Sequence, residues 1–261
     1  MDAIILGGGT LKGLQHNGTS SKALIQIENK PMVEYLIDTL HETSFISKIV
    51  AIVPLSAQYE NWAPKVHKVL NADDSFIENV RSGLEYLENV PGGCSDRVMV
   101  ASCDIPLITA KVVEDFVDLC STIDAEIIYP IIPRDVVERR YPETKRTYAK
   151  MKEGYFTGGN IMLVRPSAVL KNYELVKKAY ALRKSPLKLS RELGPKFIMK
   201  FLTNSLSVTE AEERVGELLN AKSRAVIIPH PEIGIDVDKV EDLELIQKIL
   251  RTPGRRSQSP N

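Results

Sequence analysis

The feature of this sequence that most constrains its fold is the alternation of short apolar runs with amphipathic segments over the first 130 residues. The apolar runs, which have the length and composition of buried strands, lie at residues 2–6, 48–53, 65–70 and 97–101. The segments with helical spacing of apolar residues begin at Pro31, Ser75 and Thr109. This alternation predicts an α/β fold, a mainly parallel Rossmann-like sheet with helices on both faces. Ligands of such sheets bind at the carboxyl ends of the strands.

The second half of the chain departs from this regular pattern after residue 125. Residues 146–151 and 155–164 predict a hairpin that turns at Glu153-Gly154, and we interpret this hairpin as the start of a second layer. Residues 166–221 are helical in propensity and rich in lysine, arginine and leucine. They are too short to form a core of their own, so we interpret them as a helical insertion.

The chain returns to the sheet after this insertion, with an apolar run at residues 224–228. We therefore predict one domain over residues 1–251, with the helical insertion at about 166–221 near its carboxyl end. Apolar spacing predicts a last helix at residues 240–250. The polar tail that follows, residues 252–261, is expected to be disordered.

The charge balance restricts the partners that the chain can attract. Acidic and basic residues number 34 each, so no global field draws the protein to nucleic acid or to an anionic membrane. No stretch approaches 18 apolar residues, and the three cysteines form no C-x-x-C pair. We expect a cytoplasmic protein with reduced thiols that binds neither nucleic acid nor membrane, and we leave homo-oligomer formation open.

A glycine-rich loop follows the first strand and is the first candidate for a binding site. It comprises Leu6, Gly7, Gly8, Gly9 and Thr10, with Lys12 and Lys22 further along the chain. Backbone N–H groups of such a loop can approach phosphate oxygens, and a nearby lysine supplies positive charge. The spacing fits neither G-x-G-x-x-G nor a P-loop, so a tight turn with solvated lysines is the structural alternative.

Carboxylates near two predicted strand ends are the second candidate. Asp104 follows the run at 97–101 in Ser-Cys-Asp-Ile-Pro, and Asp236 and Asp238 lie in Ile-Gly-Ile-Asp-Val-Asp before the last helix. If residues 233–238 form a strand beside Asp104, Asp236 and Asp238 point the same way, since side chains alternate with a period of two. Such carboxylates suit Mg²⁺. The alternatives are a turn cap for Asp104, and helix caps or surface charges for the other two.

Taken in order, five stretches of the chain resemble the MobA-like NTP-transferase family of GT-A-like fold. This family includes molybdenum-cofactor guanylyl- and cytidylyltransferases and sugar-1-phosphate nucleotidyltransferases. The matching stretches are AIILGGG, SKALIQIENKPMVEYLIDTL, SCDIPLIT, YFTGGNIMLV and GIDVDKVEDLELI. The most specific of them is the second, in which a lysine precedes a short strand, a polar turn, a proline and an amphipathic helix.

The resemblance implies a role for each matching residue. Lys22 corresponds to the triphosphate-binding lysine, Asp104 to the metal-binding aspartate, and Asp236, with Asp238 close behind, to the second metal ligand. The residues that the resemblance implies for acceptor contact are Gly159 and Asn160. Those that it implies, more loosely, for contact with the base or ribose are Asn71, Ser75 and Asn79.

The loop after the glycines departs from the family pattern L-x-x-G-x-x-x-R-M. Gly13 stands at the arginine position and the loop to Lys22 is longer than usual. Lys12 is our candidate to replace the arginine, although it lacks the bidentate guanidinium fork. The segment at 166–221 resembles an insertion in uncharacterised bacterial relatives, which suggests a distinct acceptor.

These observations predict a Mg²⁺-dependent nucleotidyltransferase that joins a nucleoside monophosphate from an NTP to a phosphorylated small-molecule acceptor and releases pyrophosphate. The expected catalytic residues are Lys22, Asp104 and Lys12, and no protein nucleophile is required because positioning and charge neutralisation carry such transfers. Cys103, beside Asp104, is interpreted as a buried thiol.

Three alternatives remain open at this point. The first is a GT-A-fold glycosyltransferase that uses the D-x-D of Asp236-Val237-Asp238, and the second is a catalytically weakened nucleotide-binding regulatory module. A third possibility is that the basic helices around residues 177–200 contact a membrane surface, although a packing helix or an oligomer interface is the simpler interpretation.

Overall fold

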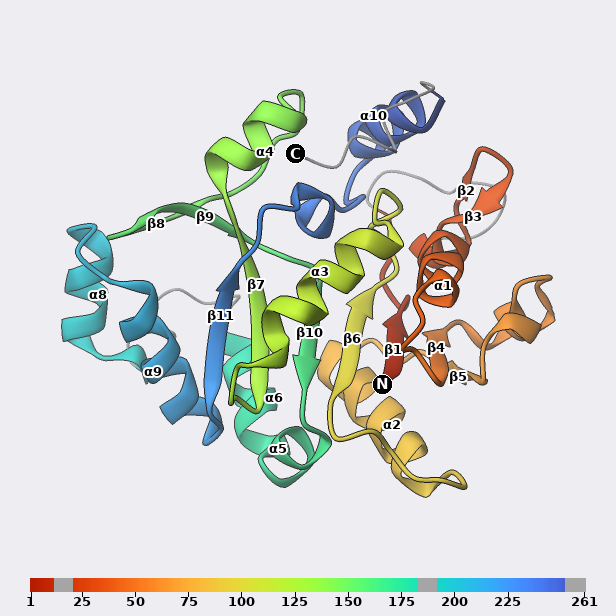
Figure 1. Ribbon diagram of the computed structural model, residues 1–261, viewed down its shortest axis with the longest axis horizontal. Helices are drawn as coiled ribbons and strands as arrows, with labels where there is room; N and C mark the ends of the chain where they lie inside the picture. Colours follow the sequence, from red (N-terminus) through yellow and green to blue (C-terminus); the bar gives the residue numbers. More distant parts are fainter. Residues whose placement is uncertain (12–20, 183–191, 252–261) are drawn as a thin grey trace.

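The computed structural model describes residues 1–11, 21–182 and 192–251. Within these ranges the central sheet has nine strands, in the order β5-β4-β1-β6-β10-β7-β9-β8, and β11 pairs with β7 (Figure 1). Helices pack on both faces of this sheet, so the α/β architecture expected from the sequence is confirmed. Lys12 and the tail at residues 252–261 lie outside the described residues.

One half of the sheet is parallel, and the carboxyl ends of its strands lie beside the candidate site. Its strands are β1 (Asp2–Leu6), β4 (Ile49–Val53), β5 (Lys68–Asn71) and β6 (Val98–Ser102). β1 lies between β4 and β6, and Leu6 is opposite both Ile52 and Ser102. The N–H of Cys103 donates to the carbonyl of Leu6 at 2.9 Å. The end of β6 is therefore fixed beside the glycine loop.

The other half of the sheet is mostly antiparallel. Its strands are β7 (Ile127–Pro133), β8 (Ala149–Met151), β9 (Gly154–Gly158), β10 (Ile161–Val164) and β11 (Ser223–Ile227). The predicted hairpin exists as β8 and β9, but β9 pairs with β7 in the main sheet. The expectation of a second layer was therefore wrong. The run at 155–164 is not one strand but two, β9 and β10, which are separated by Gly159 and Asn160, and β10 inserts between β6 and β7.

Side chains of β1 alternate between the two faces of the sheet, and each face is covered by different helices. Ala3 and Ile5 pack in the core under α1 (Met32–Glu42) and α3 (Ala110–Ser121), whereas Ile4 and Leu6 face α2 (Phe76–Asn89) and α5 (Pro166–Lys171). A fully buried strand must be apolar on both sides, which explains why its sequence is a continuous apolar run.

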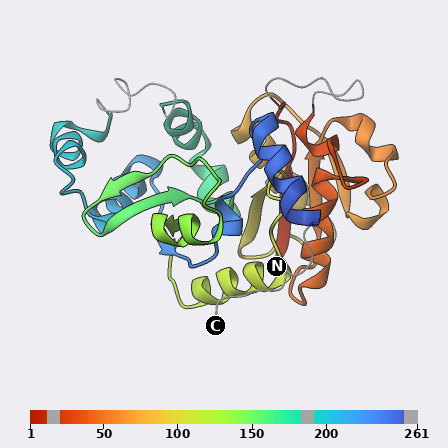
Figure 2. The same ribbon diagram turned by 90° about the horizontal axis from the view of Figure 1, so that it is seen from above.

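The remaining helices lie around this core. They are α4 (Arg134–Arg140), α6 (Tyr173–Leu182), α8 (Pro195–Leu202), α9 (Val208–Leu219) and α10 (Val240–Arg251). Seen from above, α10 crosses the edge of the sheet at which β1 and β6 end (Figure 2). None of the helices within the described ranges is long and apolar enough to cross a membrane.

The helical insertion is built on the sheet and on α2. The rings of Phe76 in α2 and Tyr180 in α6 stack at 4.8 Å between centroids, and α9 packs on β11. Neither α8 nor α9 has a fully buried residue in its described span. This supports our proposal that residues 166–221 extend one domain.

Three local expectations differ from the structure. β5 begins later than the predicted run at 65–70, because the 3-10 helix η3 (Ala63–Lys65), with a proline in its first turn, occupies the start. α4, directly after β7, was not predicted. Residues 233–238 are not a strand: the 3-10 helix η4 (Pro231–Gly234) is followed by extended chain. Gly234 packs against Ile132 of β7: a Cβ added at Gly234 would lie 3.0 Å from Cδ1 of Ile132. This segment therefore lies over β7.

Candidate functional site

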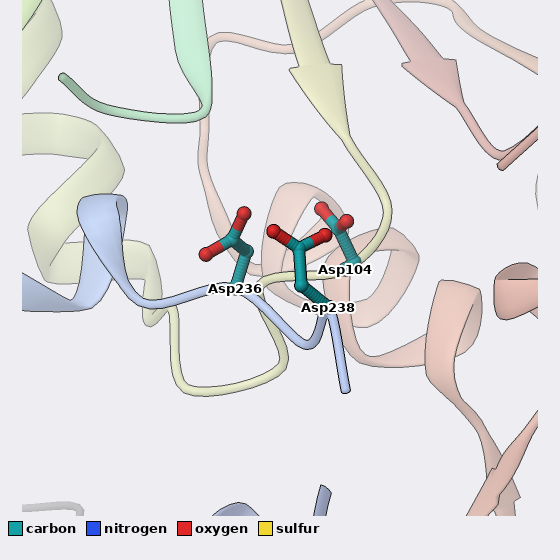
Figure 3. A group of neighbouring side chains, drawn as sticks. All are labelled: Asp104, Asp236 and Asp238. Atoms are coloured by element: carbon teal, nitrogen blue, oxygen red, sulfur yellow. The ribbon is translucent and has the colours of Figure 1, made fainter. Parts of the chain in front are cut away.

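Three carboxylates converge at the end of β6. One oxygen from each of Asp104, Asp236 and Asp238 lies within 4.8 Å of the others, and Figure 3 shows the three side chains directed to one region. Asp104 is two residues beyond β6, and the other two lie between η4 and α10. The N–H of Val237 donates to the carbonyl of Asp104 at 2.9 Å. One backbone hydrogen bond thus brings together the acidic pair and Asp104 without the predicted strand.

Lys22 completes this cluster from the glycine-loop side. Its ammonium lies 2.8 Å from Oδ2 of Asp104 and 2.5 Å from Oδ1 of Asp238, and its side chain is 10% exposed. Burial lowers the pKa of Lys22, but the two carboxylates more than offset burial and raise this pKa above its usual value. Lys22 is therefore a fixed positive charge at neutral pH.

The glycine loop passes directly over Lys22. A Cβ added at Gly7 would lie 2.7 Å from Cγ1 of Val53 and 2.8 Å from Cβ of Ala23, so only glycine fits there. The N–H of Lys22 donates to the carbonyl of Gly9 at 2.9 Å. Gly8 and Gly9 are exposed, and no described residue accepts a hydrogen bond from their N–H groups. Two free donors therefore lie beside a buried cation, an arrangement that suits phosphate.

The ends of the loop have structural contacts. Leu6 is buried, and its carbonyl accepts the bond from Cys103. Thr10 is exposed and forms an isolated antiparallel bridge with Ser21, which directs the chain back to Lys22. Lys12 lies outside the described residues, so its catalytic role stays a prediction.

Two residues that support the aspartates were missed in the sequence. The hydroxyl of Ser102 donates to Oδ1 of Asp104 at 2.5 Å. Arg146, in the segment between α4 and β8, donates from Nη1 to Oδ1 of Asp236. Ser102 stands in the same motif as Asp104, so its position was a usable signal. No feature of the sequence connects Arg146 to an aspartate 90 positions later.

The charges around Asp236 oppose one another. Burial raises its pKa, Arg146 works in the opposite direction, and the carboxylates of Asp104 and Asp238 raise the pKa further, so that the net shift is upward. A positive ion placed among the three carboxylates would relieve this repulsion.

Gly159 and Asn160, expected near the acceptor, hold the segment that carries Asp236. The backbone N–H and side-chain amide of Asn160 both donate to the carbonyl of Ile233, at 2.8 and 3.3 Å, and its own carbonyl accepts from Ser102. A Cβ added at Gly159 would lie 2.4 Å from Cγ2 of Ile233. These contacts position the site, and contact with an acceptor stays a prediction.

Asn71, Ser75 and Asn79, expected near the base or ribose, shape the loop on the other side of Gly8. Asn71 accepts from the N–H of Leu55 at 3.0 Å, and Ser75 accepts from that of Glu78 at the start of α2. The buried amide of Asn79 holds the backbone of Asp73 through two bonds of 2.7 and 2.9 Å. Their contact with a nucleotide likewise stays a prediction.

Cys103 lies beneath the site but is poorly suited to be a nucleophile. It is 2% exposed, and burial followed by the charge of Asp104 raises the pKa of its thiol. A neutral buried thiol is a core residue, as the sequence suggested.

A cavity of about 740 Å³ borders the acidic cluster, and no described residue of the glycine loop lines it. Asp236 and Asp238 form part of its wall, and the rest comes from residues 143–147, Thr157 and the start of α10. Asp236 and Asp238 therefore belong both to the acidic cluster beside Lys22 and to the wall of this cavity.

Known proteins resemble this chain over part or most of its length. A molybdenum cofactor guanylyltransferase of Shewanella piezotolerans is 24% identical over 127 residues, which span 49% of this chain and only 58% of that protein. A structure described as a hypothetical transferase from Thermus thermophilus is 36% identical, with a TM-score of 0.82, and the match covers 93% of this chain and 98% of that one.

A more distant structure shares the fold. The 2-C-methyl-D-erythritol 4-phosphate cytidylyltransferase of Thermus thermophilus superposes with a TM-score of 0.57 at 13% identity, covering 96% of this chain and 98% of that one. The family model described as the MobA-like NTP transferase domain matches residues 3–197. The chain therefore belongs to the family of MobA-like NTP transferase domains.

Proposed function

We propose that this protein transfers a nucleoside monophosphate from an NTP to a phosphorylated small-molecule acceptor and releases pyrophosphate. The observation that carries the proposal is the meeting of Lys22, Asp104 and Asp236 beside the exposed N–H groups of Gly8 and Gly9. The name of the Shewanella piezotolerans relative, a guanylyltransferase, supports nucleotidyl transfer by this family.

The donor set of the acidic cluster fits a hard divalent cation such as Mg²⁺. Three carboxylates supply oxygen ligands within 4.8 Å of one another, and burial, together with the neighbouring carboxylates, raises the pKa of Asp236. Asp104, Asp236 and Asp238 would hold the ion. Its chemistry there would be to neutralise charge on the phosphates near the reacting phosphorus.

The residues of the chain would bind and orient the NTP. The N–H groups of Gly8 and Gly9 donate to phosphate oxygens, and the Lys22 ammonium balances the charge of the triphosphate. In the present arrangement this ammonium is paired with Asp104 and Asp238. Binding of a cation to these carboxylates would free Lys22 for the triphosphate.

The acceptor would bind in the cavity, which is lined by Asp236 and Asp238 and by no described residue of the glycine loop. With the triphosphate at the glycine loop and the acceptor in this cavity, an acceptor phosphate oxygen would attack the α-phosphorus in line, with pyrophosphate as the leaving group. Ser102 keeps the Asp104 carboxylate in place during this step.

The experiment starts with a thermal-shift screen of the four NTPs with Mg²⁺, because a ligand that binds only the folded state raises the unfolding temperature. Pyrophosphate release is then followed with the stabilising NTP and a panel of sugar and polyol phosphates. Asp104→Asn should abolish both the shift and the release, whereas Asp124→Asn, at an exposed surface pair with Lys222, should leave both unchanged.

Other outcomes would replace the proposal. Normal turnover by Asp104→Asn would remove Asp104 from the mechanism. Sugar transfer from a nucleotide sugar without pyrophosphate would indicate a glycosyltransferase, and Mg²⁺-dependent NTP binding without turnover across the panel would indicate a regulatory module.

A further inference from the structure

The guanidinium of Arg146 uses only part of its hydrogen-bonding capacity within the described residues. Its side chain is 19% exposed and its Nη1 pairs with one oxygen of Asp236, while its buried Nε finds no acceptor among the described residues. An arginine that uses both edges of its fork on a carboxylate is held more firmly than one with a single contact. The Arg146–Asp236 pair is therefore open to exchange.

Arg146 also lies on the wall of the cavity that opens on the acidic cluster. The same wall carries the ammonium groups of Lys145 and Lys239, neither of which forms an ion pair with any described residue. The lining also includes Thr147 and Thr157, and, beyond Asp236 and Asp238, the acidic residues Glu143, Glu241, Asp242 and Glu244. A phosphate in this cavity would therefore be recognised beside Arg146, where the guanidinium and the unpaired ammonium groups are donors that favour a phosphate over the neighbouring carboxylates.

We propose that Arg146 exchanges partners: it pairs with Asp236 when the acidic cluster holds no cation, and it binds the acceptor phosphate in the cavity when a divalent cation occupies Asp236. The proposal rests on the proposed function, since it assigns the phosphate of the acceptor to this cavity. Arg146 would thus be a substrate-binding residue for phosphomonoesters.

The exchange follows from charge compensation. A cation on Asp236 takes away the only described partner of a guanidinium that is mostly buried, and a buried charge without a partner is costly. An anion in the cavity removes that cost. Cation and phosphomonoester should therefore bind cooperatively, and by linkage each raises the affinity for the other by the same factor.

The test uses isothermal titration calorimetry on the full chain without nucleotide, with Mn²⁺ as the cation and glycerol 3-phosphate as the phosphomonoester. In the wild type, saturating Mn²⁺ should tighten binding of glycerol 3-phosphate at least about fivefold, the usual lower range of coupling between sites. Glycerol, which lacks the phosphate, should show no such change.

Variants distinguish exchange from a merely structural ion pair. Arg146→Gln should bind Mn²⁺ more tightly than the wild type, because a competing cation is gone, and should lose the effect of Mn²⁺ on glycerol 3-phosphate. Arg146→Lys keeps a charge but not the fork, so it should fold and retain only part of the coupling. Arg139→Gln removes an arginine from nearby α4, with an exposed partner, and should behave as the wild type.

The proposal is overturned if Arg146→Gln binds Mn²⁺ equally or less tightly, which is the result of a purely structural role, or if its coupling is unchanged. It is also overturned if the wild type shows no Mn²⁺-dependent binding of glycerol 3-phosphate. These titrations contain no NTP, so a failure of the proposed nucleotidyl transfer would appear in the pyrophosphate assay and not here.

Discussion

Replacing Lys22 by methionine removes a buried cation while nearly preserving the volume of the side chain. Asp104, whose side chain is 10% exposed, would lose its counter-ion and face two further carboxylates. Breaking a buried pair from one side costs about 3–5 kcal/mol. The second partner, Asp238, is 60% exposed and stays solvated, so the lower end of that range applies.

We therefore expect Lys22→Met to lose about 3 kcal/mol of unfolding free energy without divalent cations. For a chain of this size this corresponds to a fall of roughly 6–12 °C in the unfolding temperature. Mn²⁺ at 100 times its dissociation constant should restore about 2.7 kcal/mol, because the ion replaces the missing positive charge.

Urea unfolding and differential scanning fluorimetry in EDTA and in Mn²⁺ measure both effects. Lys111→Met is the matched control: its pair with Asp115 joins neighbouring turns of α3 on the surface, so little change is expected. Ordinary surface substitutions change the free energy of unfolding by up to about 0.5 kcal/mol. The reasoning would be refuted if Lys22→Met in EDTA differed from the wild type by no more than that.

Three further predictions concern the same region. Gly159→Ala should lower the free energy of unfolding, measured in urea, by about 1–3 kcal/mol, because its Cβ would overlap Ile233. Gly9→Ala is the control, since its Cβ would make only ordinary contacts with Lys22. Equal stabilities of the two variants would argue against close packing of Gly159 on Ile233. The pKa of Lys22 is raised in the folded state, so the stability that its charge contributes should be fully present below the unfolded pKa of about 10.4. The difference in unfolding free energy between the wild type and Lys22→Met should therefore decline only as the pH rises beyond that value. A decline already at neutral pH would contradict the ion pairs. Cys103→Ala should keep its pyrophosphate release, because burial raises the pKa of this thiol and keeps it neutral; loss of turnover in a folded variant would indicate a catalytic thiol.

Local patterns were sufficient to predict the parallel half of the fold. The strand at residues 2–6 and the helix that follows Ser75 were predicted from the spacing of their apolar residues, which depends only on neighbours in the sequence. Asp104 could be placed at the edge of the sheet because it follows the strand at 97–101, whereas Lys22 and Asp236 were assigned to the same site through the resemblance to the family.

The parts that could not be predicted depend on long-range contacts. The insertion of β10 between β6 and β7 decides that the hairpin joins the main sheet, and no local pattern reports that pairing. The predicted strand at 233–238 failed because Gly234 packs closely against β7. Arg146 is an arginine in a loop like many others until the fold brings it to Asp236.

The most direct test of the site is the position of Mn²⁺ in crystals grown with a non-hydrolysable NTP analogue, located by its anomalous scattering. Our account predicts a peak bonded to Asp104, Asp236 and Asp238, with the Lys22 ammonium moved from Asp104 and Asp238 to the triphosphate. An ion bound elsewhere, or a triphosphate bound away from Lys22 and the glycine loop, would contradict it.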